Sequence, residues 1–156
     1  MRPEGPIAAD VDALVRERKY IKELPRVVEG HNEYRMKAVV YSRATRKPTG
    51  AVIMATAQKS PTGIPKWFPS AVLEMNGRFR IRGINHALRH DCPNGPIVYG
   101  WHEHIWSNQY QDHVVIKARP APDNPTMSGL FEWGLKKWNI AVGEPKTKGE
   151  RHGRTK

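Results

Sequence analysis

The chain has 156 residues, of which 38% are hydrophobic, and its formal net charge is +11 at pH 7. A chain of this length predicts one domain, because it can bury a core of its own without disulfide or metal crosslinks. Its single cysteine, Cys92, excludes an internal disulfide, and the lack of a long apolar segment argues against a secretion signal or membrane span, so we expect a cytoplasmic protein without membrane contact.

The positive charge is not confined to the C-terminal end. Residues 143–156 carry five Lys or Arg and two Glu, and the rest of the chain still holds 21 basic and 13 acidic side chains, a net charge of +8. A basic protein attracts polyanions, and nucleic acid is the commonest polyanion inside a cell. We therefore expect RNA or another nucleic acid as a partner.

The first half of the chain predicts a helix and two strands. Residues 8–23 combine a rough apolar stripe with an acidic start and a basic end, which predicts a helix that stops before Pro25. Residues 34–43 and 50–57 have the composition of strands and are separated by a short turn. The proline-rich residues 59–70 predict a loop, anchored by its Trp-Phe pair.

The second half predicts three more strands and a closing helix. Residues 78–84, 97–106 and 113–118 alternate or concentrate β-branched side chains as strands do. A long turn over 85–96, with an Asn-Gly pair near its end, connects the first two. Apolar side chains at helical spacing predict a helix over 127–140.

Together these elements predict an α+β fold: an N-terminal helix, an antiparallel sheet of about five strands and a C-terminal helix. We expect residues 1–142 to form the single domain. Residues 143–156 have no apolar period and predict a disordered basic tail.

The segment 97–106 carries the most informative alternation. Side chains two apart in a strand share a face, so His102 and His104 are expected on one face with Trp106. The opposite face carries Trp101 and looks directed to the core, with Glu103 as a charged misfit. We expect Trp101 and Trp138 to be core residues, whereas Trp106 is placed to stack on a base.

Arginines alternate in the preceding strand. Arg78, Arg80 and Arg82 are expected to share one face and to form a positive stripe suited to phosphate oxygens, unless they merely keep a sheet face solvated. If this strand pairs with 97–106, the stripe and the histidines can lie on one open face. The remaining basic residues expected to contact nucleic acid are Arg35, Lys37 and Arg89.

The histidines suggest acid–base chemistry. Metal-independent RNA cleavage needs a base for the 2′-hydroxyl, an acid for the leaving oxygen and cations for the phosphorane charge. His90, His102 and His104, with the arginines, are candidates for these roles. Tyr110 is a candidate proton donor or base-stacking platform, and Asp112 is expected to orient a histidine or to hold an arginine.

A metal site is the rival interpretation of the two histidines. A His-x-His pair on a strand commonly supplies two metal ligands, and His90 or Asp112 could complete the set. The carboxylate that would follow in a cupin-like motif is absent, because Asn108 stands there. We therefore predict no metal and no cofactor.

Residues 82–115 resemble a family of small uncharacterised prokaryotic proteins of the domain-of-unknown-function kind. That family carries an arginine strand, a histidine before an Asn-Pro-Asp-Gly-like turn, a His-x-His-Ile-aromatic segment and a Tyr-x-Asp. The resemblance extends over about residues 10–140. The matching residues are Arg82, His90 before the turn 92–95, His102, His104, Ile105, Trp106, Tyr110 and Asp112.

The resemblance is incomplete. Ile84 and Asn94 stand where the family has acidic residues, and Gln109 and Gln111 replace its glycines. The family is distantly similar to TumE-type toxins of toxin–antitoxin pairs, which implies RNA cleavage by analogy and an antitoxin or another protein as a partner. The first hypothesis is therefore a metal-independent toxin-type endoribonuclease. The alternative is a non-catalytic nucleic-acid- or protein-binding factor of phage or host-defence type.

Overall fold

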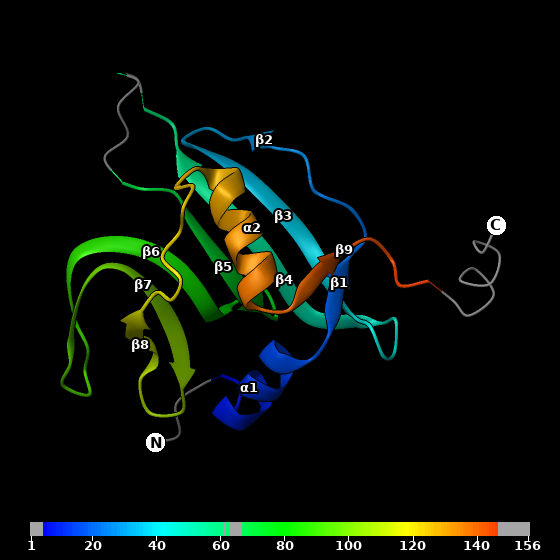
Figure 1. The fold of residues 1–156 in the computed structure, drawn as a ribbon, viewed down its shortest axis with the longest axis horizontal. Coiled ribbons are helices and arrows are strands. Elements are labelled where there is room, and N and C mark those ends of the chain that lie inside the picture. The colour runs from blue at the N-terminus through cyan, green and yellow to red at the C-terminus, as the bar shows by residue number, and fades with distance from the viewer. Residues whose placement is uncertain (1–4, 61, 63–66, 147–156) are drawn as a thin grey trace.

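The computed structural model describes residues 5–60, 62 and 67–146 (Figure 1). The α+β class is confirmed, but the described residues form nine strands rather than about five. In chain order the elements are α1 (Ala8–Arg16), β1 (Lys19–Ile21), β2 (Val28–Glu29), β3 (Glu33–Ser42), β4 (Pro48–Gln58), β5 (Ser70–Met75), β6 (Phe79–Asp91), β7 (Ile97–Ser107), β8 (Gln111–Lys117), α2 (Met127–Lys137) and β9 (Ile140–Val142).

The strands of the described residues form one sheet in the order β8-β7-β6-β5-β4-β3-β1-β9, with β2 also paired to β3. From β3 to β8, neighbours in the sheet are neighbours in sequence and run antiparallel, as short connections favour. The conditional pairing of the arginine strand with 97–106 is confirmed, because β6 pairs with β7.

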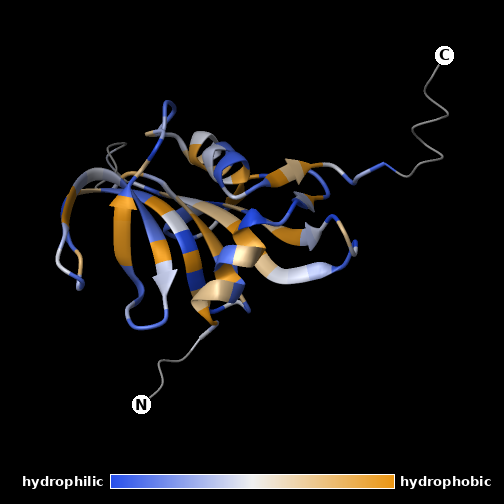
Figure 2. Cartoon of the chain, turned by 60° about the horizontal axis from the view of Figure 1, so that its bottom comes forward, coloured by the Kyte–Doolittle hydropathy of each residue, from blue (hydrophilic) through white to orange (hydrophobic). Residues whose placement is uncertain are grey.

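Helix α2 covers one face of the sheet, over β3, β4 and β5 (Figure 1). Its N-cap residue Thr126 accepts a hydrogen bond from the N–H of Gly129, and its apolar side is buried in the core. Trp138 follows the helix and is fully buried, as predicted. Gly134 makes room for it, since a Cβ there would lie 2.6 Å from the Trp138 ring. Figure 2 shows the alternation of hydrophobic and hydrophilic stretches along the strands.

Helix α1 is shorter than the predicted range 8–23, because Lys19–Ile21 leaves the helix to form β1. The side chain of Lys19 is buried and donates three hydrogen bonds to main-chain carbonyl oxygens at the end of α1. Burial lowers the pKa of Lys19 to about 8. Tyr20 and Ile21 then become buried sheet residues, which explains their apolar character without a longer helix.

The predicted turn over 85–96 is wrong for most of its length. Strand β6 continues to Asp91, and only 92–96 remain outside the strands, where the Asn-Gly pair forms the expected tight turn. Strand β5 has no predicted counterpart, although its residues Ser70–Met75 alternate partly buried and buried side chains. These two changes insert a strand and lengthen the hairpin that carries the histidines.

Strands β6, β7 and β8 bend away from the other strands (Figure 1), and we call residues 79–117 the β6–β8 curl. The tip of its first hairpin reaches over to β8. There His90 Nε2–H donates to the carbonyl oxygen of His113 at 2.9 Å, and the Cys92 thiol donates to that of Val115 at 3.5 Å. In β8 the main-chain groups of every second residue point toward β7. Those of Ala118 do so, because its N–H donates to Trp101 on β7, and the carbonyls of His113 and Val115 therefore point away from β7. Side chains from β6 and its turn thus occupy the free edge of β8.

The C-terminal end of the described chain lies against the sheet. The N–H of Gly143 donates to the carbonyl oxygen of Ile21, and the guanidinium of Arg46 donates to that of Pro145, both at 2.8 Å. The start of the predicted tail is therefore ordered, whereas residues 147–156 lie outside the described residues. No helix within the described ranges has the length and hydrophobicity to cross a bilayer.

Candidate functional site

The three arginines expected on one face are divided by a β-bulge. Arg80 pairs with Glu74 on β5, whereas Arg82, two residues later, pairs with the adjacent Leu73. The extra residue reverses the alternation of β6, so Arg80 and Arg82 point to opposite faces of the sheet. Arg78 lies in the exposed turn before β6. The predicted arginine stripe is therefore wrong as a geometric feature.

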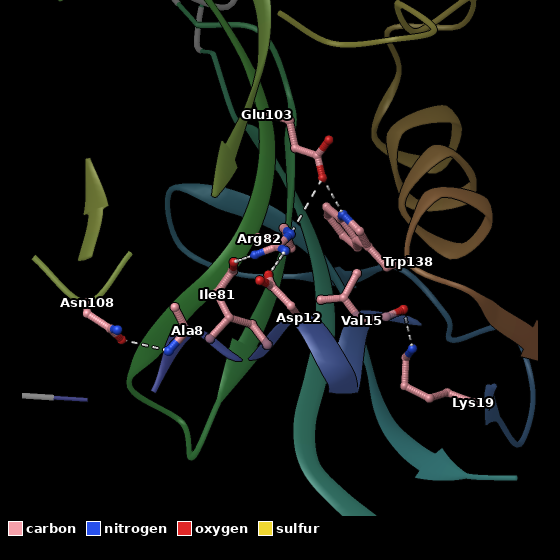
Figure 3. A network of polar contacts seen from close by, with 9 residues as sticks. All are labelled: Ala8, Asp12, Val15, Lys19, Ile81, Arg82, Glu103, Asn108 and Trp138. Atoms are coloured by element: carbon pink, nitrogen blue, oxygen red, sulfur yellow. Dashed lines mark hydrogen bonds and ion pairs between the residues drawn. The ribbon is translucent and has the colours of Figure 1, made fainter. Parts of the chain in front are cut away.

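Arg82 is buried in a polar network that joins both helices to the curl (Figure 3). Its guanidinium donates to Asp12 on α1 and to the carbonyl oxygen of Ile81, both at 2.8 Å. Its Nε lies 3.9 Å from the buried carboxylate of Glu103, which accepts a hydrogen bond of 2.9 Å from the Trp138 indole. Glu103, the misfit of the sequence pattern, is thus the partner of two buried side chains. Arg82 ties elements together and is not placed to contact nucleic acid.

The three predicted catalytic histidines do come together. The ring centroids of His90 and His102 lie 5.2 Å apart, those of His90 and His104 5.7 Å, and those of His102 and His104 5.1 Å. We call these three residues the histidine cluster. His90 joins the cluster because of a second β-bulge in β6, between Ala87 and His90. Without this extra residue, Arg89 instead of His90 would pair with Val98 on β7.

Main-chain carbonyls fix one protonated nitrogen in each ring. His102 donates from Nδ1 to Gly100 at 2.9 Å, and His104 donates from Nδ1 to the carbonyl oxygen of Asp112 at 2.7 Å. His90 donates from Nε2 to a carbonyl of β8. A carbonyl only accepts, so each donating nitrogen carries a proton. Burial lowers the pKa of His102 and of His104, which favours their neutral rings and leaves an acceptor on the second nitrogen of each.

Asn85 on β6 contacts the histidine cluster through His104. Its Oδ1 is placed 3.1 Å from His104 Nε2, and the two atoms of a side-chain amide can be interchanged by rotating it half a turn. Since Nε2 of the neutral ring is an acceptor, the amide must turn its NH2 group toward it. The histidine thereby orients the amide of Asn85, which sequence reasoning did not single out.

The histidine face is the inside of the β6–β8 curl and not the open face that the sequence predicted. His102 and His104 are only 1% and 5% exposed, because the curl places β6 and β8 around them. Burial, above all, lowers the pKa of His102, and burial together with the nearby Arg80 charge lowers the pKa of His104 to about 4. His90, half-buried, is the accessible member of the cluster.

Arg80 is the cation beside the cluster. Its guanidinium makes two contacts of 2.9 Å with one carboxylate oxygen of Asp112. The prediction that Asp112 holds an arginine is confirmed, and its main chain also accepts the His104 bond. A guanidinium held in place beside three imidazole rings is an arrangement that can face a phosphate charge.

The described residues contain no group of three or more His, Cys, Asp or Glu side chains placed to hold a metal ion. In the cluster, one nitrogen of each ring donates to the main chain, and the second nitrogen of His104 faces Asn85. Both ring nitrogens of His104 therefore already have partners, and neither is left to bind a metal ion.

Comparisons with known proteins add no relative. No family model matches the chain, and no match is found among the curated proteins or the solved structures. The resemblance of residues 82–115 to a prokaryotic family therefore stays a prediction.

Two other predicted site residues make no hydrogen bond or ring contact with the cluster within the described chain. Trp106 is buried in the core, where its indole donates to Pro6 at 2.7 Å and its ring meets the edge of Phe79. It is not available for stacking on a base, because the chain before α1 covers it. Tyr110 lies half-buried in the turn between β7 and β8, and within the described chain its hydroxyl makes no hydrogen bond to the cluster.

The remaining basic residues of the prediction are dispersed. Arg35 on β3 pairs with Glu33 at 2.7 Å, and Arg89 on β6 pairs with Asp91 at 2.9 Å. Lys37 is exposed on β3, which lies three strands from β6 and about 14 Å from it along the sheet. With Arg80 and Arg82, four of the predicted cations are already matched by carboxylates.

A group of exposed basic residues that the sequence did not predict as a site lies between β3 and β4. Arg43, Arg46 and Lys47 are exposed in the turn between β3 and β4, and we call them the basic turn. The N–H of Arg43 bonds to Arg18, another exposed cation. In the described part of the chain none of the three forms an ion pair. Their density in sequence, three cations in five residues, was the available signal.

Proposed function

We propose that this chain is a nucleic-acid-directed protein, with RNA as the first partner to test, and that its primary role is binding in the cytoplasm. The observation that supports this is the surface charge: fifteen Lys or Arg but seven Asp or Glu are exposed within the described residues. Such an excess attracts a phosphate backbone whatever the sequence of the strand.

The basic turn is the proposed main phosphate contact. Replacing Arg43, Arg46 and Lys47 with alanine is expected to weaken RNA binding and to lower the slope of log K against log salt by about 2, since each lost contact with a single strand removes about 0.7. The measurement is a titration of labelled RNA between about 50 and 200 mM salt, the range in which such contacts dominate.

The matched control removes the same number of charges elsewhere. A triple alanine variant of Arg35, Lys37 and Arg89 has the same net charge as the basic-turn variant, but two of its arginines are ion-paired. We expect a smaller change in slope. Equal changes in both triples would mean that net charge alone drives binding, and no binding by the native chain would refute the proposal.

A metal-independent endoribonuclease of toxin type is the second candidate. It is favoured by the half-buried His90, which is packed against two other histidines, and by Arg80 beside the cluster. The proton of a 2′-hydroxyl would pass to His90 Nδ1 as the 2′-oxygen attacks the phosphorus. The bond from phosphorus to the 5′-oxygen would then break, the 5′-oxygen would leave with a proton from water, and the arginine would face the charge that develops on the phosphate. His102 and His104, being buried, would position His90. Such a toxin would have an antitoxin as its partner.

If cleavage occurs, replacing His90 with alanine is expected to slow it by at least about 100-fold, as loss of a general base does. The assay uses a labelled RNA in EDTA and compares His90→Ala with the His102→Ala/His104→Ala double variant. His31→Ala, a change at an exposed histidine outside the cluster, is the control. Equal cleavage by all four proteins would remove the cluster from the mechanism, and RNA binding without cleavage would leave binding as the function.

A further inference from the structure

A cleft with a volume of about 530 Å³ opens beside the histidine cluster. It lies where the end of β4, the start of β5 and the middle of β6 meet, and its volume is that of a small-molecule site. Asn85 belongs to both features, because it lines the cleft and its amide is oriented by His104. The cleft and the cluster are therefore separated by a single side chain.

Aromatic rings form one wall of the cleft. Trp67 and Phe68 are 67% and 52% exposed, although large aromatic side chains are usually buried. Phe68 is fixed by ring contacts, with centroids 4.5 Å from His86 and 5.4 Å from Trp101. The main chain of Trp67 is held by a hydrogen bond to Gln58. The expected anchoring of the loop is thus made by Phe68, while Trp67 keeps an open face.

The rest of the lining is polar but carries little net charge. Asn32 and Asn85 contribute amides, and Thr56 and Ser70 contribute hydroxyls that lie 3.4 Å apart. Glu33 is the charged residue of the described lining, and Arg35 neutralises it. Such a lining does not favour a phosphate. It suits a flat ring with donors and acceptors on its edge, because amides and hydroxyls can bond to both.

We propose that this cleft holds an unpaired nucleobase of the bound strand. This inference rests on the proposed function, which supplies the strand through its phosphates. The base stacks against the wall that Trp67 and Phe68 form together, and its edge meets the amides of Asn32 and Asn85. Because a base can enter the cleft only after it leaves its stack and its pair, the protein selects single-stranded over duplex nucleic acid.

The test separates the base from the backbone. The probes are a labelled ten-nucleotide 2′-O-methyl RNA, which cannot be cleaved through its 2′-oxygen, and a strand of the same length without bases. Trp67→Ala and Phe68→Ala are each expected to weaken binding of the first probe about 10-fold, the usual effect of losing one stacking ring, and to leave the second unchanged. Tyr99→Ala is the matched control, since Tyr99 is a ring 60% exposed on β7 outside the cleft.

The outcomes distinguish the two proposals. If the native chain binds neither probe, the proposed nucleic-acid function is wrong. If it binds both probes equally and neither cleft variant differs from Tyr99→Ala, the chain binds the backbone and the cleft does not hold a base. If the cleft variants lose the same amount of binding to both probes, the cleft does not hold a base either. Tighter binding of the base-containing probe, lost in both cleft variants, is the result that the inference requires.

Discussion

Replacing Arg82 with methionine is expected to lower the free energy of unfolding by about 3–5 kcal/mol. Methionine fills a similar volume but leaves the buried carboxylate of Glu103 without its cation and Asp12 without its bond. A buried charge that loses its partner is costly, because neither solvent nor protein then compensates it. The measurement is urea unfolding followed by tryptophan fluorescence, with the midpoint falling at constant m-value.

The control for this prediction is Arg89→Met. Arg89 also pairs with an aspartate at 2.9 Å, but both side chains are exposed, so a change of about 0–1 kcal/mol is expected. Adding Glu103→Gln to the Arg82 variant should recover part of the loss, since it removes the unpaired charge while an amide oxygen can still accept from Trp138. Similar losses in the Arg82 and Arg89 variants would show that the network in Figure 3 does not hold the two helices to the curl.

Acid is expected to destabilise the fold through the histidine cluster. The pKa of His104 is lowered to about 4 in the folded chain, against about 6.5 when unfolded. Between these values the unfolded chain binds more protons, so stability is fully present above pH 6.5 and falls as the pH drops toward 4. The loss from this group alone is about 3 kcal/mol, and His102, whose pKa is also lowered, adds to it in the same direction.

The measurement is the pH dependence of the unfolding free energy, compared between the native chain and His104→Gln. The variant is less stable at neutral pH but should show a shallower slope between pH 6.5 and 4. His31→Gln, at an exposed position, should leave the slope unchanged. An NMR titration of the ring protons checks the cause directly: a His104 signal that moves with a midpoint near 6.5 would contradict it.

The sequence predicted those helices and strands in which hydrophobic and polar side chains follow a clear period. Alternation placed β3, β4, β7 and β8 within a few residues, and it correctly put His102 and His104 on one face. The helical spacing of apolar residues placed α2. In β4 and α2 the side chains that make the pattern are also those that the fold buries, so local sequence and tertiary packing agree there.

The rest depended on contacts between segments far apart in sequence. Two bulges in β6 decide that Arg80 and not Arg82 accompanies the histidines, and that His90 joins them. Plain alternation within β6 puts Arg80, Arg82 and His90 on one face, because a one-residue insertion in pairing is not visible in a single strand. The bend of the curl, which buries the cluster, likewise depends on contacts between β6 and β8.

The capped edge of β8 has a consequence for the protein in a crowded solution. A sheet grows by adding foreign strands to unpaired main-chain groups at its ends, which is how many β-rich proteins aggregate. Here the outward carbonyls of His113 and Val115 are already bonded, and at the opposite end β9 has only three residues. His90 and Cys92 therefore occupy two of the acceptors that a foreign strand would need at this edge, whatever ligand the neighbouring rings meet.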